Sequence, residues 1–182
     1  VRPDSVTVMN SFGDIVEKQP QEVNWDLSAA EKGGYEHFMI KEIMEQPQAV
    51  SNTIHPRIKD GKVVFEDEGL TDERLANAHH IHIIGCGSAL HAGMVGRSII
   101  EKLSRVRCTA WVASEFRYEN PIIEPDDLCI VISQSGETAD TLAAMRQAKQ
   151  AGAYTAAIVN VVSSTIAREA DGVLYLWAGP EI

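Results

Sequence analysis

The sequence contains no apolar run that approaches the ~20 residues needed for a helix to cross a bilayer. Its longest apolar run, Leu128–Ile132, has the length of a buried strand. The first residues, Val1–Asp4, do not show the charged and then apolar pattern of a targeting segment. We therefore expect a protein of the cytoplasm that does not enter a membrane.

Positive charge is also scarce. The 182 residues include 16 Lys and Arg against 26 Asp and Glu, which gives a formal charge of −10. Such a surface repels phosphate backbones and anionic lipid, so we expect neither nucleic acid nor a membrane surface as a partner. Hydrophobic residues make up 45% of the chain and charged residues 23%, which is a globular composition and argues against disorder.

Few residues are typical metal or disulfide ligands. The chain has three cysteines: Cys86, Cys108 and Cys129. An odd number in apolar segments indicates buried thiols of a reduced protein rather than disulfides or a metal site. Alternation along a strand would place His80 and His82 on one face, but the sequence suggests no further ligand. We expect half-exposed strand histidines, no metal and no cofactor.

The first third of the chain has a different sequence pattern from the rest. Residues 5–18 alternate weakly around the turn-forming Asn10–Asp14, which predicts a small β-hairpin. Two strands alone are barely stable, so we expect this hairpin to be the edge of a larger unit. Residues 19–34 are polar and predict a linker.

Helices are predicted before the main repeat begins. Apolar residues recur at helical spacing from Tyr35 to about Ile54, and Pro47 is expected to break or restart that helix. Asp60-Gly61 predicts a tight turn. Thr71 followed by two acidic residues predicts a helix start. We expect these helices to pack against the sheet that follows.

From residue 80 the pattern alternates between strand and helix. The predicted strands lie at residues 82–84, 108–113, 128–132, 156–159 and 173–176. Helices are expected after Ser88, over 138–151 and over 164–170. This alternation predicts a three-layer α/β fold, a doubly wound sheet of five parallel strands with helices on both faces.

Two loops should meet beyond the carboxyl ends of these strands, where such sheets bind ligands. One is Gly85–Ala89 and the other is Ser133–Thr138. The second opens a helix, where free N–H groups and the helix dipole favour an anion. It supplies three hydroxyls and the Gln134 amide but no Lys or Arg. This neutral set of donors predicts a site for the phosphate of a small metabolite.

Two other interpretations of these loops fit the sequence less well. A plain helix cap would use one serine and Glu137, but it leaves two hydroxyls and an amide unexplained. Gly85-Cys86-Gly87 suggests a dinucleotide turn, yet position 90 is Leu rather than glycine, and residues 105–108 offer no ribose-binding acid. We therefore rank a nucleotide-binding domain last.

Several motifs together resemble the glutamine–fructose-6-phosphate aminotransferase (isomerizing) family. They are Cys86–Ser88, Ala113–Tyr118, Ser133–Thr141 and Ala178–Ile182, with Glu31–Met39 and Glu45–Pro47 resembling the junction between that family's two halves. The Ser133–Thr138 loop alone is typical of any sugar isomerase (SIS) domain, whereas the junction points to the aminotransferases. The resemblance implies a flavodoxin-like SIS fold.

The resemblance also implies an activity and a set of site residues. The family adds ammonia from glutamine to fructose 6-phosphate and isomerises the product to glucosamine 6-phosphate. The substrate-binding residues it implies here are Ser88, Ala89, Ser133, Gln134, Ser135 and Thr138. The family usually has Thr-Ser where this chain has Ser88-Ala89, so Ala89 can offer only its backbone.

By the same resemblance, residues 1–34 end a glutaminase domain and its linker, and residues 35–182 form the first SIS domain, with helices over 35–79. It implies that the catalytic residues of both half-reactions lie outside this chain, that no cofactor is needed, and that the whole enzyme is a homodimer. The alternative function is a SIS module that senses sugar phosphates for a transcription regulator, which would carry a helix-turn-helix segment.

Overall fold

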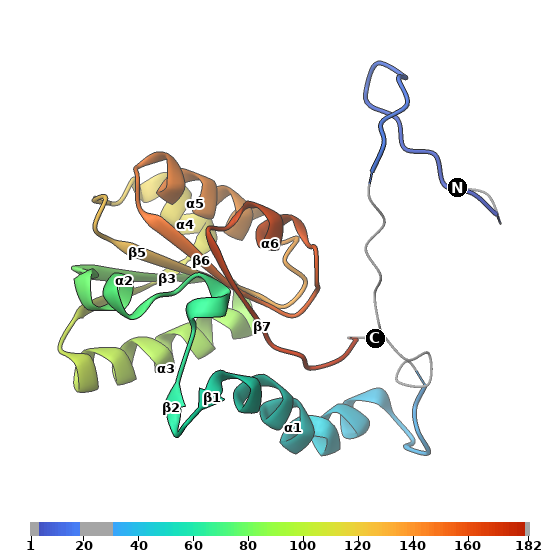
Figure 1. The fold of residues 1–182 in the computed structure, drawn as a ribbon, viewed down its shortest axis with the longest axis horizontal. Helices are drawn as coiled ribbons and strands as arrows, with labels where there is room; N and C mark the ends of the chain where they lie inside the picture. The colour runs from blue at the N-terminus through green and yellow to red at the C-terminus, as the bar shows by residue number, and fades with distance from the viewer. Residues whose placement is uncertain (1–3, 19–30, 181–182) are drawn as a thin grey trace.

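A computed structural model describes residues 4–18 and 31–180 of the chain. Its centre is a five-stranded parallel sheet in the order β4-β3-β5-β6-β7 (Figure 1). The strands are β3 (His80–Gly85), β4 (Arg107–Val112), β5 (Leu128–Ser133), β6 (Tyr154–Val159) and β7 (Gly172–Tyr175). All five predicted strands are present, and their order is that of a flavodoxin-like doubly wound sheet.

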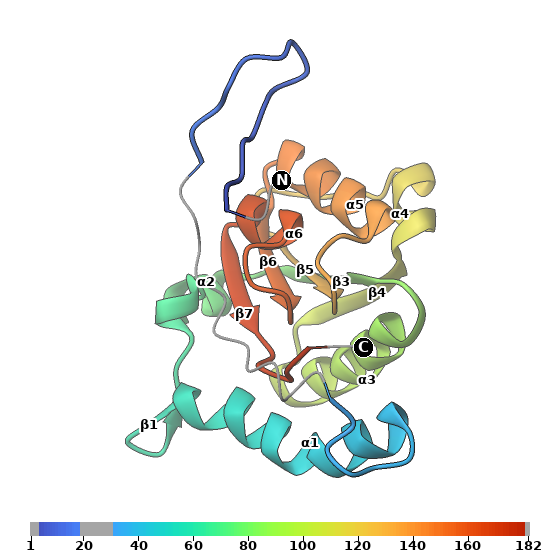
Figure 2. The same cartoon turned by 90° about the vertical axis from the view of Figure 1, so that its right-hand side faces the viewer.

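Helices cover both faces of the sheet. They are α3 (Gly87–Ser104), α4 (Ala113–Glu119), α5 (Ala139–Gln150) and α6 (Thr165–Glu169). Helices α4, α5 and α6 lie on one face and α3 on the other, as both views show (Figures 1 and 2). The predicted three-layer α/β fold is therefore confirmed.

Each face of the sheet has its own hydrophobic core. Phe116, Met145 and Ile166 from α4, α5 and α6 pack on the inward residues of β3, β5 and β6. On the other face, Ile81 and Ile83 pack in a second cluster with Ile100 of α3. Burial on both faces explains why the central strands are continuously apolar rather than alternating.

The structure changes two expectations for α1 (Phe38–Ile54). This helix continues through Pro47 instead of breaking there. Proline removes one backbone hydrogen bond, and Pro47 is exposed, so no packed neighbour prevents the helix from accommodating its ring. The apolar side chains do not pack on the sheet either: of the α1 residues only Lys41 is buried, whereas Met39 is 72% exposed.

Arg57 holds the end of α1 to the sheet. It lies in η2 (His55–Arg57), pairs with Glu68 of η3 (Glu66–Glu68) at 2.9 Å, and donates to the carbonyl of Tyr175 at 3.1 Å. The side chain of Thr53 also donates to the carbonyl of Leu176. These contacts fasten the C-terminal end of the helix to the β7 edge.

Local turns follow the predictions. The segments β1 (Ile58–Lys59) and β2 (Lys62–Val63) pair across Asp60-Gly61, both with positive φ. Thr71 caps α2 (Asp72–Asn77) by accepting from the Arg74 amide. The N-terminal hairpin includes the antiparallel bridge between Met9 and Ile15, and residues 4–18 stand apart from the sheet (Figure 1). Most of the predicted linker, residues 19–30, lies outside the described residues.

Candidate functional site

The two loops singled out in the sequence lie side by side. Gly85 ends β3 beside Ile132 of β5, so the turn into α3 and the Ser133–Thr138 loop leave the sheet at adjacent strand ends. Strands β3 and β5 lie at the switch point of the sheet, because the chain runs from β3 outward to β4 and then returns to β5 on the other side. Ligands of doubly wound sheets bind at this place.

A cavity of about 250 Å³ opens between the loops. It is lined by Cys86, Ser88, Ala89, Ile132, Ser133, Gln134, Ser135 and Thr138. All six predicted site residues thus line one cavity. Ligand binding by these residues stays a prediction.

Backbone amides orient the hydroxyls of the loop. The amide of Gly136 donates to Ser133 Oγ at 3.1 Å, and the amide of Glu137 donates to Ser135 Oγ at 3.2 Å. Ser133 Oγ also lies 3.0 Å from Thr138 Oγ1. The amides occupy acceptor positions on the two serines, so the hydroxyl hydrogen of Ser135 stays available to donate to an anion. Of the Ser133 and Thr138 hydroxyls, one donates to the other, which leaves one hydrogen of that pair available.

The loop is fastened from behind to the segment that follows β6. The carbonyl of Gln134 accepts from the amide of Asn160 at 3.0 Å, and the carboxylate of Glu137 accepts from the amide of Thr165 at 2.6 Å. These bonds from Thr165 lower the pKa of Glu137, which keeps the carboxylate ionised. Gly136 has φ +65°, and a Cβ there would lie 2.0 Å from Ser164 Oγ. Glycine is therefore required at position 136.

The described surroundings of the cysteines do not favour nucleophilic chemistry. All three are free thiols. Burial raises the pKa of Cys108 to about 11 and that of Cys129 to about 12, so both stay protonated. Cys86 lines the cavity, and its described polar neighbour is the hydroxyl of Thr141 at 3.9 Å, which is not a base.

The histidine expectation was wrong in one respect, because His82 is 1% exposed rather than half-exposed. It sits on central β3, between β4 and β5, with Phe116 at its edge. With His80 and Asp127 it forms a cluster of possible metal ligands. Both ring nitrogens of His82 are already used, by Trp111 at 3.0 Å and by Asp127 at 3.2 Å, so the cluster is better explained as a hydrogen-bond network.

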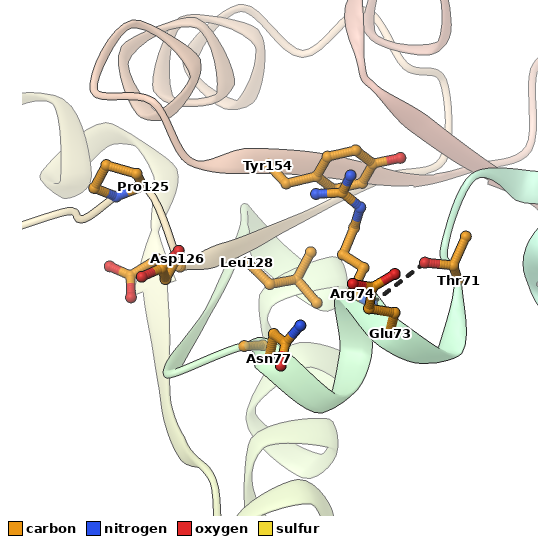
Figure 3. Close-up of a pocket in the computed structure, with 10 residues that line it drawn as sticks. Thr71, Glu73, Arg74, Asn77, Pro125, Asp126, Leu128 and Tyr154 are labelled. Atoms are coloured by element: carbon orange, nitrogen blue, oxygen red, sulfur yellow. Dashed lines mark hydrogen bonds between the residues drawn. The ribbon is translucent and has the colours of Figure 1, made fainter.

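A second cavity, of about 320 Å³, lies at the opposite end of the strands (Figure 3). There the guanidinium of Arg74 covers the ring of Tyr154 at 3.7 Å, with Glu73 close by and Asp126 across the cavity. This cavity lies where β5 and β6 begin, and its carboxylates would repel a phosphate. The smaller cavity at the carboxyl ends is therefore the better candidate for an anion.

Sequence reasoning did not find that Asn160 and Thr165 hold the loop. Their roles depend on contacts between the ends of β5 and β6, which the sequence does not pair. The hydroxyl run Ser163–Thr165, after a strand and before a helix, repeats the character of the Ser133–Thr138 loop and was the available signal.

The SIS domain family matches this sequence over residues 74–182. The chain belongs to this family. The glutamine–fructose-6-phosphate aminotransferase of Caldanaerobacter subterraneus subsp. tengcongensis is 53% identical over 100% of this chain and 30% of its own length. The same-named protein of Clostridium acetobutylicum is 51% identical over 98% of this chain and 30% of its own.

The solved C-terminal domain of glucosamine-fructose-6-phosphate aminotransferase from Francisella tularensis has a TM-score of 0.78 and 42% identity, over 84% of this chain and 43% of that one. The resemblance stated from the motifs is confirmed. The chain spans about 30% of the length of the aminotransferases that it matches. No helix in the described part is long and apolar enough to cross a membrane.

Proposed function

We propose that this SIS domain binds fructose 6-phosphate for a glutamine–fructose-6-phosphate aminotransferase, which converts it with ammonia from glutamine to glucosamine 6-phosphate. The observation that carries the proposal is the convergence of hydroxyls and an amide at the start of α5, from Ser133, Gln134, Ser135 and Thr138. Whole-chain similarity to aminotransferases supports this substrate over others of its class.

The geometry suits a phosphate that must bind and leave. The N-terminus of the 12-residue α5 attracts an anion through its dipole and its free amides. The hydroxyl of Ser135 and one hydroxyl of the Ser133–Thr138 pair add directional donors. Lys and Arg are absent from the cavity lining, so the attraction stays moderate. Ser88 and the backbone of Ala89 would face the sugar from the other loop.

Proton transfer is not assigned to this cavity. Its lining contains no histidine and no carboxylate that could serve as the base of an isomerisation. We therefore expect the 182-residue chain to make no glucosamine 6-phosphate from fructose 6-phosphate with glutamine or with ammonia. Formation of the product by the pure chain would contradict this.

Calorimetric titration of the chain with fructose 6-phosphate tests the binding, and fructose, which lacks the anion, is the control. We expect weak binding of the phosphate ester and none of fructose. Equal binding of both sugars would show that the loop serves only as a helix cap.

The remaining parts of the proposal concern the whole protein. Residues 1–34 would end a glutaminase domain and residues 35–182 would form the first SIS domain. The assembly would be a homodimer working in the cytoplasm on amino-sugar synthesis, with no nucleic acid partner. A sensing module is less well supported, because similarity to aminotransferases extends over the whole chain, including the segment before residue 74.

A further inference from the structure

Asn160 joins two segments of the chain at the carboxyl end of β6. It directly follows that strand, where the pairing with β7 ends in a bond of 2.9 Å from the Leu176 amide to the Val159 carbonyl. Asn160 is 4% exposed. Its Oδ1 accepts from the amide of Ala178 at 2.9 Å, and its Nδ2 donates to the carbonyl of Gly179 at 2.6 Å. The side chain thus holds the chain beyond the point where the sheet ends.

The segment held in this way, Leu176–Pro180, has an unfavourable backbone. Trp177 has φ +48° and Gly179 has φ +81°. A left-handed conformation at a bulky residue persists only where the surrounding structure imposes it. An asparagine side chain carries one donor and one acceptor and no charge, which suits one free N–H and one free C=O. The two bonds from Asn160 therefore help to keep this segment in its place.

The main chain beside the same side chain holds the candidate site loop. The amides of Asn160 and Val161 both donate to the carbonyl of Gln134, at 3.0 and 3.3 Å. A trans peptide unit is planar, and its C=O and N–H point in opposite directions. Fixing the Gln134 carbonyl therefore also fixes the direction of the Ser135 amide, which has no hydrogen-bond partner within the described residues.

The peptide between Gln134 and Ser135 lies between two cavities. Gln134 lines the phosphate cavity and also a cavity of about 320 Å³ between α1 and the segment Leu176–Pro180. Asn160 lines only the second of these two cavities. Its bonds thus reach the Gln134 carbonyl from the side away from the phosphate cavity, and the Ser135 amide is left for the phosphate side.

We propose that Asn160 is a positioning residue of the phosphate site. Its side chain, bonded to Ala178 and Gly179, fixes the place of the two amides that hold the Gln134 carbonyl, and this directs the Ser135 amide at the phosphate. The segment after β7 therefore supports the site without lining the phosphate cavity. The inference rests on the proposed function, because the bound phosphate is what the Ser135 amide would contact.

Titration of the 182-residue chain with fructose 6-phosphate tests the role. Asn160→Ala should bind several-fold more weakly than the parent, because the Gln134 carbonyl is held less firmly. Asn52→Ala is the matched control: this residue is exposed on α1, its side chain bonds to Gln48, and its loss should leave the affinity unchanged. Equal affinity of Asn160→Ala and the parent would overturn the proposal.

Asn160→Asp separates positioning from general damage to the fold, because it keeps the size of the side chain. An ionised carboxylate still accepts from the Ala178 amide but cannot donate to the Gly179 carbonyl, whereas a protonated carboxyl can do both. Burial should raise the pKa of the new carboxyl, as should Glu42 and Glu45, the titratable residues that line the same cavity.

The loss of affinity in Asn160→Asp should accordingly depend on pH. It should be several-fold at pH 8 and should shrink toward pH 5.5, while the loss in Asn160→Ala should not shrink. Each affinity is compared with that of the parent at the same pH, which cancels the change in charge of the phosphate ester itself. An equal loss in Asn160→Asp at both pH values would contradict the proposal.

Amide hydrogen exchange without ligand distinguishes this inference from the proposed function. In Asn160→Ala the Val161 amide, which donates to Gln134, should exchange several-fold faster than in the parent. The Ile166 amide, which donates to the Gly136 carbonyl, should keep its rate. Unchanged exchange at Val161 would overturn the positioning role. If the parent does not bind fructose 6-phosphate, the proposed function fails, while the exchange rates still decide whether the Asn160 side chain holds the loop.

Discussion

The indole Nε1–H of Trp111 donates a hydrogen bond of 3.0 Å to Nδ1 of His82. Because Nδ1 accepts this bond, the hydrogen of the neutral imidazole lies on Nε2, which is 3.2 Å from Asp127 Oδ2. One buried ring thereby connects β3, β4 and the segment before β5. Protonation of His82 at Nδ1 would bring an N–H group to face the indole N–H of Trp111, and the hydrogen bond between them would be lost.

Stability should consequently fall in mild acid. Burial lowers the pKa of His82 below its ordinary 6.5, although Asp127 acts in the opposite direction, and burial also lowers the pKa of His80. As the pH falls, the unfolded chain therefore takes up protons before the folded chain does. The contribution of these histidines to the free energy of unfolding is complete above about pH 6.5 and decreases as the pH falls toward their lowered pKa in the folded state. Urea unfolding between pH 8 and pH 5.5 measures this, and His82→Gln should flatten the profile more than His80→Gln. An unchanged profile in His82→Gln would contradict the assignment.

Trp111→Phe should destabilise the fold by roughly 1–3 kcal/mol, because it leaves Nδ1 of His82 buried without a donor. Guanidinium unfolding gives the free energy directly. Trp177→Phe, at a tryptophan that is 45% exposed, is the control and should have little effect. Equal effects of the two substitutions would show that the Trp111 bond contributes nothing.

Thr138→Val should weaken binding of fructose 6-phosphate several-fold, because it removes one neutral donor worth ~0.5–1.5 kcal/mol and keeps the shape of the side chain. Ser135→Ala should do the same. Both variants should unfold at nearly the parent temperature, since the two side chains lie at the cavity surface. Calorimetry with each variant checks this, and unaltered affinity would exclude the loop as the phosphate site.

Gly136→Ala should impair both folding and binding. An added Cβ would meet Ser164 Oγ at 2.0 Å and Ser164 Cβ at 2.5 Å, and the residue would have to keep φ +65°. The strain of that backbone alone is about 1–3 kcal/mol. Gly179→Ala, also at positive φ but with open space around it, is the control and should cost less. Thermal unfolding measures both variants, and an equal loss of melting temperature in the two would contradict the steric role of Ser164.

The sheet could be predicted from the sequence because its signals are local. Leu128–Ile132 is apolar on both faces and bounded by polar residues, so its strand was found within one residue of β5. The Asp60-Gly61 turn likewise depends only on its own residues. The exposed apolar face of α1 could not be predicted, because helical spacing indicates an apolar face without saying what covers it.

Part of the site could be predicted because its signals, like those of the sheet, are local. The Ser133–Thr138 loop contains its own donors, so its residues could be recognised along the chain. The supports behind it could not: Glu137 and Thr165 are 28 positions apart in sequence and meet only because β5 and β6 are neighbours in the sheet. The same holds for Trp111 and His82, which meet through the pairing of β3 with β4.

The attachment of α1 by Arg57 determines where the chain can be shortened. Both hydrophobic clusters are built from residues at or after Phe65, and α1 is tied to the β7 edge through Thr53 in its last turn and Arg57 just after it. A polypeptide that begins near Gln48 keeps these ties and both clusters, and it loses most of the exposed apolar side chains of α1. Such a truncated domain would be the form best suited to crystallisation and to NMR measurements of the Ser133–Thr138 loop.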